Sequence, residues 1–264
     1  MNRRGLTLME VLVVIVVVGF ISAFVFPVVA QSRAAAARTS CLVNSRELAL
    51  ATSLYEQDHQ SRIFPFGYNV KGGFTTWWGD LKTGDPTKGL LYPYTKSGII
   101  RGCPGAEELP NDQPYPFTMG LGMNFRLFYR YPPMKGRIEF TTFSTSEFDR
   151  PAETILCGDT ARLSEDGNGV VSSPWLFGDS TANHLHARHA REVANVTWLD
   201  GHASSHQLAY AVHAIGEPKH TISPDVLKAN QLGDLLKFPR EHPESPVSTE
   251  RDQFYYLLEK PRGT

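Results

Sequence analysis

The sequence predicts an α+β protein in which a long N-terminal, membrane-spanning helix packs against a mainly antiparallel β-sheet head. Three observations predict this arrangement. Residues 11–30 are apolar except for Ser22 and carry no charge. Residues 32–58 contain neither Gly nor Pro and are rich in Ala, which favours continuation of the helix. After residue 62 the chain consists of turns and short runs of strand composition without regular helical alternation, which is typical of an antiparallel sheet.

The composition limits the function classes. With 264 residues and 41% apolar content, the chain can form a membrane segment and one soluble domain of ordinary size. Its formal net charge of −1 indicates no electrostatic surface for nucleic acid. The sequence contains no glycine-rich phosphate-binding loop of the P-loop or dinucleotide type.

The apolar segment begins with an unusual residue. About 20 helical residues, at about 1.5 Å each, match the roughly 30 Å of a bilayer core. Arg3 and Arg4 precede the segment and favour a cytoplasmic N-terminus. Glu10 stands where the segment starts, and an unpaired carboxylate inside hydrocarbon costs about 3 kcal/mol. Neither a plain anchor nor a secretion signal cleaved after Ala30 explains this glutamate, and the apolar run is longer than that of a signal peptide.

The residues "GLTLME", from Gly5 to Glu10, follow a basic leader and resemble the type III signal of type IV prepilins and pseudopilins. The resemblance implies that a prepilin peptidase cleaves after Gly5 and methylates the new amine of Leu6, with S-adenosylmethionine as the cosubstrate of that enzyme. Pro27 matches the family proline that bends the apolar helix. In the family, the glutamate pairs with the N-terminal amine of a neighbouring subunit. A pair within one chain is the alternative, because such positions are neighbours on a helix.

This resemblance implies a structural pilin-like subunit of a type IV pilus or a type II secretion-like filament, with no catalytic activity and no cofactor of its own. The expected partners are the prepilin peptidase/methyltransferase, other pilin-like subunits and the inner membrane. The expected topology is a single bacterial membrane span with a cytoplasmic N-terminus and a periplasmic or extracellular head.

The domain organisation follows from these segments. We expect a leader (1–5), a transmembrane and polymerisation helix (6–30), the soluble half of that helix (31–62), an α+β head (63–215), and a proline-rich linker with a short C-terminal helix (216–264). In the soluble half, an apolar stripe is predicted to pack under the sheet: Val43, Leu50, Ala51, Leu54 and Tyr55. Strands are predicted from composition at 125–129, 137–143, 154–157 and 195–199. The C-terminal helix, capped by Thr249, can dock on its own head or on another subunit.

Several head segments resemble a subgroup of pilin-like proteins with a C-terminal H-X9-DG region: "CLVNSRELALATSLYEQDHQSRIFP", "LLYPYTKSGIIRGCPG" and "RHAREVANVTWLDGH". In this chain ten residues separate His189 from Asp200 and Gly201, and Ala-Arg-Glu-Val replaces the usual glycine-rich stretch. The Asp-Gly pair also predicts a hairpin with a two-residue turn in which both positions take positive φ.

Two other function classes remain open at this level. A group of histidines could hold a divalent metal in a membrane-anchored head, although solvated or hydrogen-bonded histidines are the simpler interpretation: His184, His186, His189, His202 and His206. Trp77 and Trp78 could form a carbohydrate-stacking platform, or fill the core. The oxygen-rich "SEDGNG" at 164–169 is consistent with an exposed turn or with a calcium loop, but it lacks EF-hand spacing.

The three cysteines allow one bridge. Cys41 lies on the predicted helix just beyond the membrane, and Cys103 lies in a loop 62 residues later. We hypothesise that they pair, because closing such a loop stabilises a fold by roughly 4 kcal/mol in the chain-entropy account. Cys157, within an apolar run, is expected to be a buried free thiol.

Overall fold

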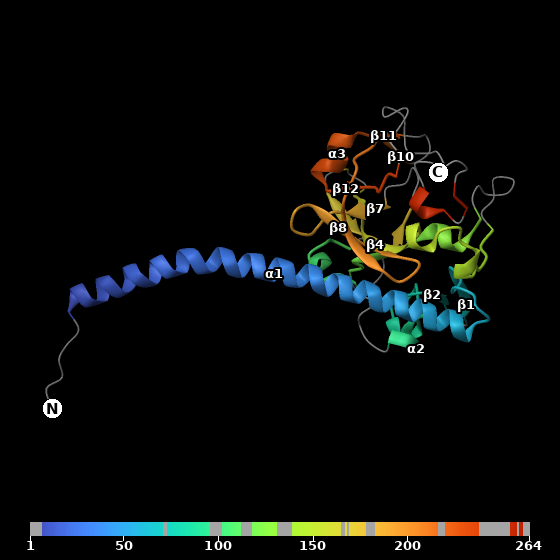
Figure 1. The fold of residues 1–264 in the computed structure, drawn as a ribbon, viewed down its shortest axis with the longest axis horizontal. Coiled ribbons are helices and arrows are strands. Elements are labelled where there is room, and N and C mark those ends of the chain that lie inside the picture. The colour runs from blue at the N-terminus through green and yellow to red at the C-terminus, as the bar shows by residue number, and fades with distance from the viewer. Residues whose placement is uncertain are drawn as a thin grey trace.

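A computed structural model describes most of the chain, and Figure 1 shows its two parts: a long helix and a compact head packed on the C-terminal half of that helix. The described residues are 7–70, 73–95, 102–111, 118–130, 139–164, 167, 169–177, 183–215, 220–237, 254–257 and 259–260. The predicted α+β class is confirmed: the long apolar helix is followed by a curled, mainly antiparallel β-sheet head.

Helix α1 runs from Leu8 to Asp58 without a break, and its 51 residues correspond to about 77 Å. Pro27 lies inside it and the helix continues through, although proline removes one backbone donor. The gently curved N-terminal half of α1 projects away from the head (Figure 1). The helix ends at His59, after which Gln60 and Ser61 take positive φ values of 56° and 58°.

The C-terminal half of α1 packs against strands β8 (Val193–Trp198) and β9 (Ala203–Gln207). Its buried face consists of Cys41, Ser45, Leu48, Ala49, Ala51, Thr52 and Tyr55. The predicted stripe is therefore partly wrong, because Val43 and Leu50 are 45% and 60% exposed. Small and polar residues dominate the face that packs, since they allow the helix backbone to approach the sheet closely.

The head is built around strand β4 (Ile155–Leu163), which contacts a different pair of strands in each half. Its first half lies between β3 (Leu121–Asn124) and β8, and its second half between β5 (Val170–Ser172) and β7 (Asn183–His186). The parallel pairing of β3 with β6 (Trp175–Leu176) makes the sheet mixed, and β12 (Leu232–Gly233) extends it beyond β7. Because β4 changes neighbours along its length, the sheet curls over the helix.

Short elements complete the head. Two ribbons, β1 with β2 and β10 with β11, are separate from the main sheet. The remaining bounds are β1 Gly67–Val70, β2 Gly73–Thr76, α2 Tyr92–Thr95, β10 His213–Ile215, β11 His220–Ile222, α3 Pro224–Ala229, and the 3₁₀ turns η1 Pro86–Lys88, η3 Pro104–Ala106, η4 Phe125–Phe128, η6 Thr145–Glu147, η7 Pro151–Glu153 and η8 Phe254–Tyr256.

The predicted hairpin at Asp200 and Gly201 connects β8 to β9, but its turn differs from the expected one. The Gly201 amide donates to the Trp198 carbonyl at 2.9 Å, and the Trp198 amide donates to the His202 carbonyl at 2.9 Å. The loop therefore has three residues, and of Asp200 and Gly201 only Gly201 has positive φ, at 93°. This is the three-residue class, in which a type I turn is followed by a left-handed glycine.

Two of the strand predictions differ from the structure. Residues 125–128 form the 3₁₀ turn η4, because the Asn124 side chain accepts a hydrogen bond from the Arg126 amide and starts a turn. The predicted strand at 137–143 begins outside the described residues, and Phe140 forms an isolated bridge with Tyr129. The predicted strands at 154–157 and 195–199 overlap β4 and β8, which begin at Ile155 and end at Trp198 respectively.

The two adjacent tryptophans belong to the core. Trp77 and Trp78 are both 0% exposed, in the cluster that also receives Leu48 and Tyr55 from α1. A carbohydrate-stacking platform needs an exposed ring face, so this geometry contradicts that interpretation.

The C-terminal segment docks on its own head. Phe254, Tyr256 and Leu257 are buried, and the Asn124 side-chain amide donates to the Tyr256 carbonyl at 3.1 Å. In place of the predicted helix, the described part contains the single 3₁₀ turn η8. Thr249 lies outside the described residues.

We predict that Leu48→Ala lowers the free energy of unfolding of the head by about 2–5 kcal/mol, because it removes a fully packed side chain from the helix–head interface. Leu50→Ala is the matched control, and we expect it to change stability by less than about 0.5 kcal/mol. The measurement is denaturant unfolding of the full chain in detergent, followed by tryptophan fluorescence. Equal effects of the two variants would show that the packed face of α1 has been assigned wrongly.

Candidate functional site

The N-terminal half of α1 is an exposed apolar surface. Among the described helices, α1 is the one that is long and apolar enough to cross a membrane. None of the residues in its most apolar stretch is buried. Leu12, Phe20 and Phe26 are 52%, 68% and 73% exposed. So large an apolar surface in a protein requires lipid or another protein as its environment.

The first turn of α1 satisfies Glu10 locally. The Thr7 backbone amide and hydroxyl both donate to Glu10 Oε2 at 2.8 Å, and the Glu10 amide donates to Thr7 Oγ1 at 3.3 Å. This reciprocal pair is a capping box, which satisfies two of the backbone donors that a helix start leaves free. The predicted processing residues Gly5 and Leu6 lie outside the described residues.

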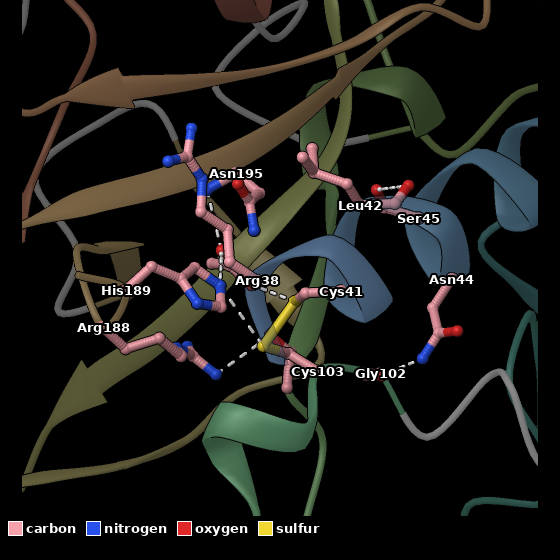
Figure 2. The surroundings of a disulfide bond; sticks show 12 residues. Arg38, Cys41, Leu42, Asn44, Ser45, Gly102, Cys103, Arg188, His189 and Asn195 are labelled. Carbon is pink, nitrogen blue, oxygen red and sulfur yellow. Dashed lines mark hydrogen bonds and ion pairs between the residues drawn. A yellow bond between two sulfur atoms is a disulfide. The ribbon is translucent and has the colours of Figure 1, made fainter. Parts of the chain in front are cut away.

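The junction between α1 and the head contains a disulfide between Cys41 and Cys103, with the two Cα atoms 4.6 Å apart (Figure 2). Polar contacts flank the bridge along the helix. Arg38 Nε donates to Ser205 Oγ at 3.1 Å on one side. Asn44 Nδ2 donates to the Gly102 carbonyl at 2.8 Å on the other. The junction therefore holds α1 covalently and also fixes its rotation against β9.

A buried carboxylate lies beneath the disulfide. Asp159 on β4 is 0% exposed, and its Oδ1 lies 3.0 Å from Cys41 Sγ. Its Oδ2 accepts the Asn195 amide at 2.7 Å and lies 2.9 Å from His189 Nε2. The same His189 nitrogen is 3.4 Å from Cys103 Sγ, and the imidazole faces the disulfide in Figure 2.

These four residues form a group that could hold a metal ion. Within the part of the chain that the structure describes, it is the one group of three or more His, Cys, Asp or Glu donors close enough for that purpose: Cys41, Cys103, Asp159 and His189. Their donor atoms lie within 4.8 Å of one another, and all four residues are buried.

Comparison with known proteins bears on the N-terminus. The family model of the prokaryotic N-terminal methylation motif matches residues 1–26, which include the leader, Glu10 and most of the apolar run. The chain therefore begins with a prepilin-type N-terminal motif, which supports a type IV pilin-like precursor. No curated protein and no solved structure matches the chain. The motif implies processing by a prepilin peptidase and a structural subunit rather than an enzyme, and together with the apolar helix it indicates membrane anchoring.

In the structure, the five histidines of the predicted cluster lie in separate places. Of the five histidines, His189 alone belongs to the cysteine–aspartate group. His202 is half-exposed and its Nδ1 lies 2.6 Å from Asp200 Oδ1 in the hairpin turn, while His206 Nε2 lies 2.7 Å from Ser204 Oγ. His184 and His186 share one face of β7, and His184 Nδ1 lies 3.7 Å from Asp234 Oδ1. A metal site made from the histidines alone is therefore not formed, and the loop at 164–169 lies partly outside the described residues.

Thr7, Asp159 and Asn195 were not predicted from the sequence as site residues. Thr7 was recognisable, because threonine three residues before glutamate at a helix start is the capping-box pattern. Asp159 offered a weaker signal, namely a carboxylate two residues after Cys157 in a strand that is otherwise largely apolar. Asn195 offered none, because its role depends on the pairing of β8 with β4.

Burial lowers the pKa of His186 to about 3, with smaller contributions from Arg188 and His189. The unfolded chain, with an ordinary histidine pKa near 6.5, therefore takes up a proton first as the pH falls. We predict that the head loses up to about 5 kcal/mol of stability from this residue between pH 6.5 and pH 3.

His186→Leu should make the decline of stability with falling pH shallower in this window, because the substituted side chain cannot be protonated. Unfolding of the full chain in detergent over a pH series measures this decline. His202→Leu is the control, since that histidine side chain is half-exposed to solvent. An unchanged pH dependence in His186→Leu contradicts the assignment.

Reduction of the disulfide should lower the free energy of unfolding by about 4 kcal/mol, since it releases a loop closed across 62 residues. The comparison is between oxidised chain and phosphine-reduced chain, both with a chelator present. Thiol counting on denatured, unreduced protein supplies the control, and we expect one thiol, from the buried Cys157. Three free thiols would contradict the pairing.

Proposed function

We propose that this chain is a pseudopilin-like structural subunit that is cleaved after Gly5, methylated at Leu6 and assembled through α1 into a type IV pilus or type II secretion-like filament. The observation that carries the proposal is the unburied apolar half of α1, which begins directly inside the methylation motif. One surface then serves two environments in turn: lipid before assembly, and the helices of neighbouring subunits afterwards.

The capping box gives Glu10 a defined role in this scheme. In the uncut chain both described hydrogen bonds to its carboxylate end on Oε2, so the local cap uses one of the two oxygens. Cleavage after Gly5 creates an amine next to Thr7. We propose that Oε1 accepts a hydrogen bond from the N-terminal amine of a neighbouring subunit, while Oε2 keeps the hydrogen bonds from Thr7. Such a pair removes the cost of an unpaired carboxylate in hydrocarbon and sets the axial register between subunits.

The proposed topology is a cytoplasmic N-terminus and a head outside the inner membrane. The disulfide supports it, because such bonds persist in oxidising compartments outside the cytoplasm. Between the end of the apolar run at Ala30 and Cys41, the helix rises about 17 Å. In the proposed topology, a helix of this length would carry the junction just beyond the headgroup region of the bilayer.

We predict that co-expression with a prepilin peptidase removes five residues and adds one methyl group, as measured by intact mass and N-terminal analysis. Retention of the leader would leave a simple anchored protein. The second part of the test is Glu10→Gln, which keeps the size of the side chain and its ability to accept from Thr7 but removes the charge.

Glu10→Gln should be processed normally yet yield about 10-fold less filament or lower, because a buried ion pair cannot form. The amount of subunit in sheared filaments is compared with that in membranes. Glu47→Gln, at an exposed position of the same helix, is the matched control and should assemble as the wild type does. Equal filament yields for both variants would overturn the proposed role of Glu10.

A further inference from the structure

We propose that the side chains of Cys41, Cys103, Asp159 and His189 bind a zinc ion when the two cysteines are reduced. The zinc site and the disulfide would be alternative ways of fastening α1 to the head. This inference concerns the junction between α1 and the head and does not depend on processing or assembly at the N-terminus.

The donor set suits zinc. Two thiolates, one imidazole and one carboxylate are ligands that zinc takes in tetrahedral sites, at about 2.3 Å to sulfur and about 2.0–2.2 Å to nitrogen or oxygen. Those bond lengths place neighbouring ligand atoms about 3.3–3.8 Å apart. In the structure the corresponding separations are 3.0 Å for Asp159 Oδ1 to Cys41 Sγ and 3.4 Å for His189 Nε2 to Cys103 Sγ. The two sulfur atoms are bonded to each other in the disulfide, so these two ligand atoms have to move apart to bind zinc, and reduction of the bond permits this.

The contact between Asp159 and Cys41 is the observation that distinguishes this group from an ordinary buried disulfide. A disulfide sulfur carries no proton, so Oδ1 at 3.0 Å faces it without a hydrogen bond. A buried carboxylate oxygen in that position is unfavourable. With a zinc ion in the group, the same oxygen and sulfur become neighbouring ligands, and the contact becomes favourable.

The surroundings already orient the ligands. The Asn195 amide donates to Asp159 Oδ2 at 2.7 Å and directs Oδ1 toward the sulfurs, which is the kind of support that metal-binding carboxylates require. The Arg188 guanidinium is also close and interacts electrostatically with Asp159. The net charge of the four side chains is −1 as disulfide, neutral imidazole and carboxylate. It is also −1 when two thiolates and a Zn²⁺ ion are present, so Arg188 balances both forms.

The exchange between the disulfide form and the zinc-bound form balances in protons and electrons. Zinc binding to the reduced site displaces the two thiol protons. In the reverse direction, the two thiolates pass two electrons to an external disulfide, which takes up two protons and becomes two thiols, while the protein disulfide forms and Zn²⁺ leaves.

The test uses the full chain in detergent, reduced with a phosphine under anaerobic conditions and titrated with Co²⁺ as a spectroscopic probe, then with Zn²⁺. We expect one Co²⁺ per chain, with sulfur-to-cobalt charge-transfer absorption and the visible bands of a tetrahedral ion. Zinc should displace the cobalt. The oxidised chain should bind neither metal at this site.

Matched variants locate the site. Asp159→Asn and His189→Gln should each weaken binding by about 10- to 100-fold or more, as loss of a ligand or of its support does. Cys157→Ser and His202→Gln should bind as the wild type does, because neither residue belongs to the group. Tryptophan fluorescence reports whether each protein is folded.

Two results would overturn the proposal: a folded, reduced chain without the charge-transfer band, or Asp159→Asn and His189→Gln chains that bind cobalt with wild-type affinity. If the reduced chain unfolds without metal, refolding with one equivalent of zinc supports the site. Continued unfolding without metal uptake counts against it.

Discussion

The attachment of α1 to the head between Arg38 and Ser45 is the interaction on which the rest of the structure depends. One continuous helix has to satisfy two environments, since its first half exposes apolar side chains and its second half packs on a sheet. The change between them occurs within about two turns. There Cys41 is bonded to Cys103, while the Arg38 side chain is hydrogen-bonded to Ser205 and the Asn44 side chain to the Gly102 carbonyl.

The buried polar groups at this junction are mutually dependent. Asp159 has an amide donor, an imidazole and a sulfur around it. The partly buried Arg188, which donates to the carbonyls of Gly120 and Thr160, supplies the compensating charge. Removing one partner would leave another buried polar group unsatisfied, which costs more than the lost bond itself. Such a network specifies one relative position of α1, β4 and the loop that carries His189.

How well each feature could be predicted from the sequence depends on how far apart in the sequence the interacting residues lie. The long apolar helix depends on a local pattern, and its prediction was confirmed. The capping box between Thr7 and Glu10 is also local, but it was not predicted. The packed face of the helix was only partly predicted, because Cys41, Ser45 and Thr52 face the sheet while the more apolar Leu50 does not. The hairpin was predicted, but its turn type depends on the register of β8 with β9. Asp159 becomes significant only after segments more than a hundred residues apart have been brought together.

The loop after His189 shows how this junction imposes a conformation on the chain. Arg191 and Glu192 have φ values of 71° and 53°, in the left-handed region that glycine adopts without cost. Each such residue costs about 1–2 kcal/mol, and it persists where its surroundings determine the conformation. Here His189 is fixed at one end by Asp159, and its amide donates to the Val193 carbonyl, which belongs to β8. Because both ends are held, three residues must reverse the chain direction, and the strain falls on the last two of them. The segment between His189 and Val193 is therefore the segment in which this chain stores backbone strain to hold an imidazole against a buried carboxylate.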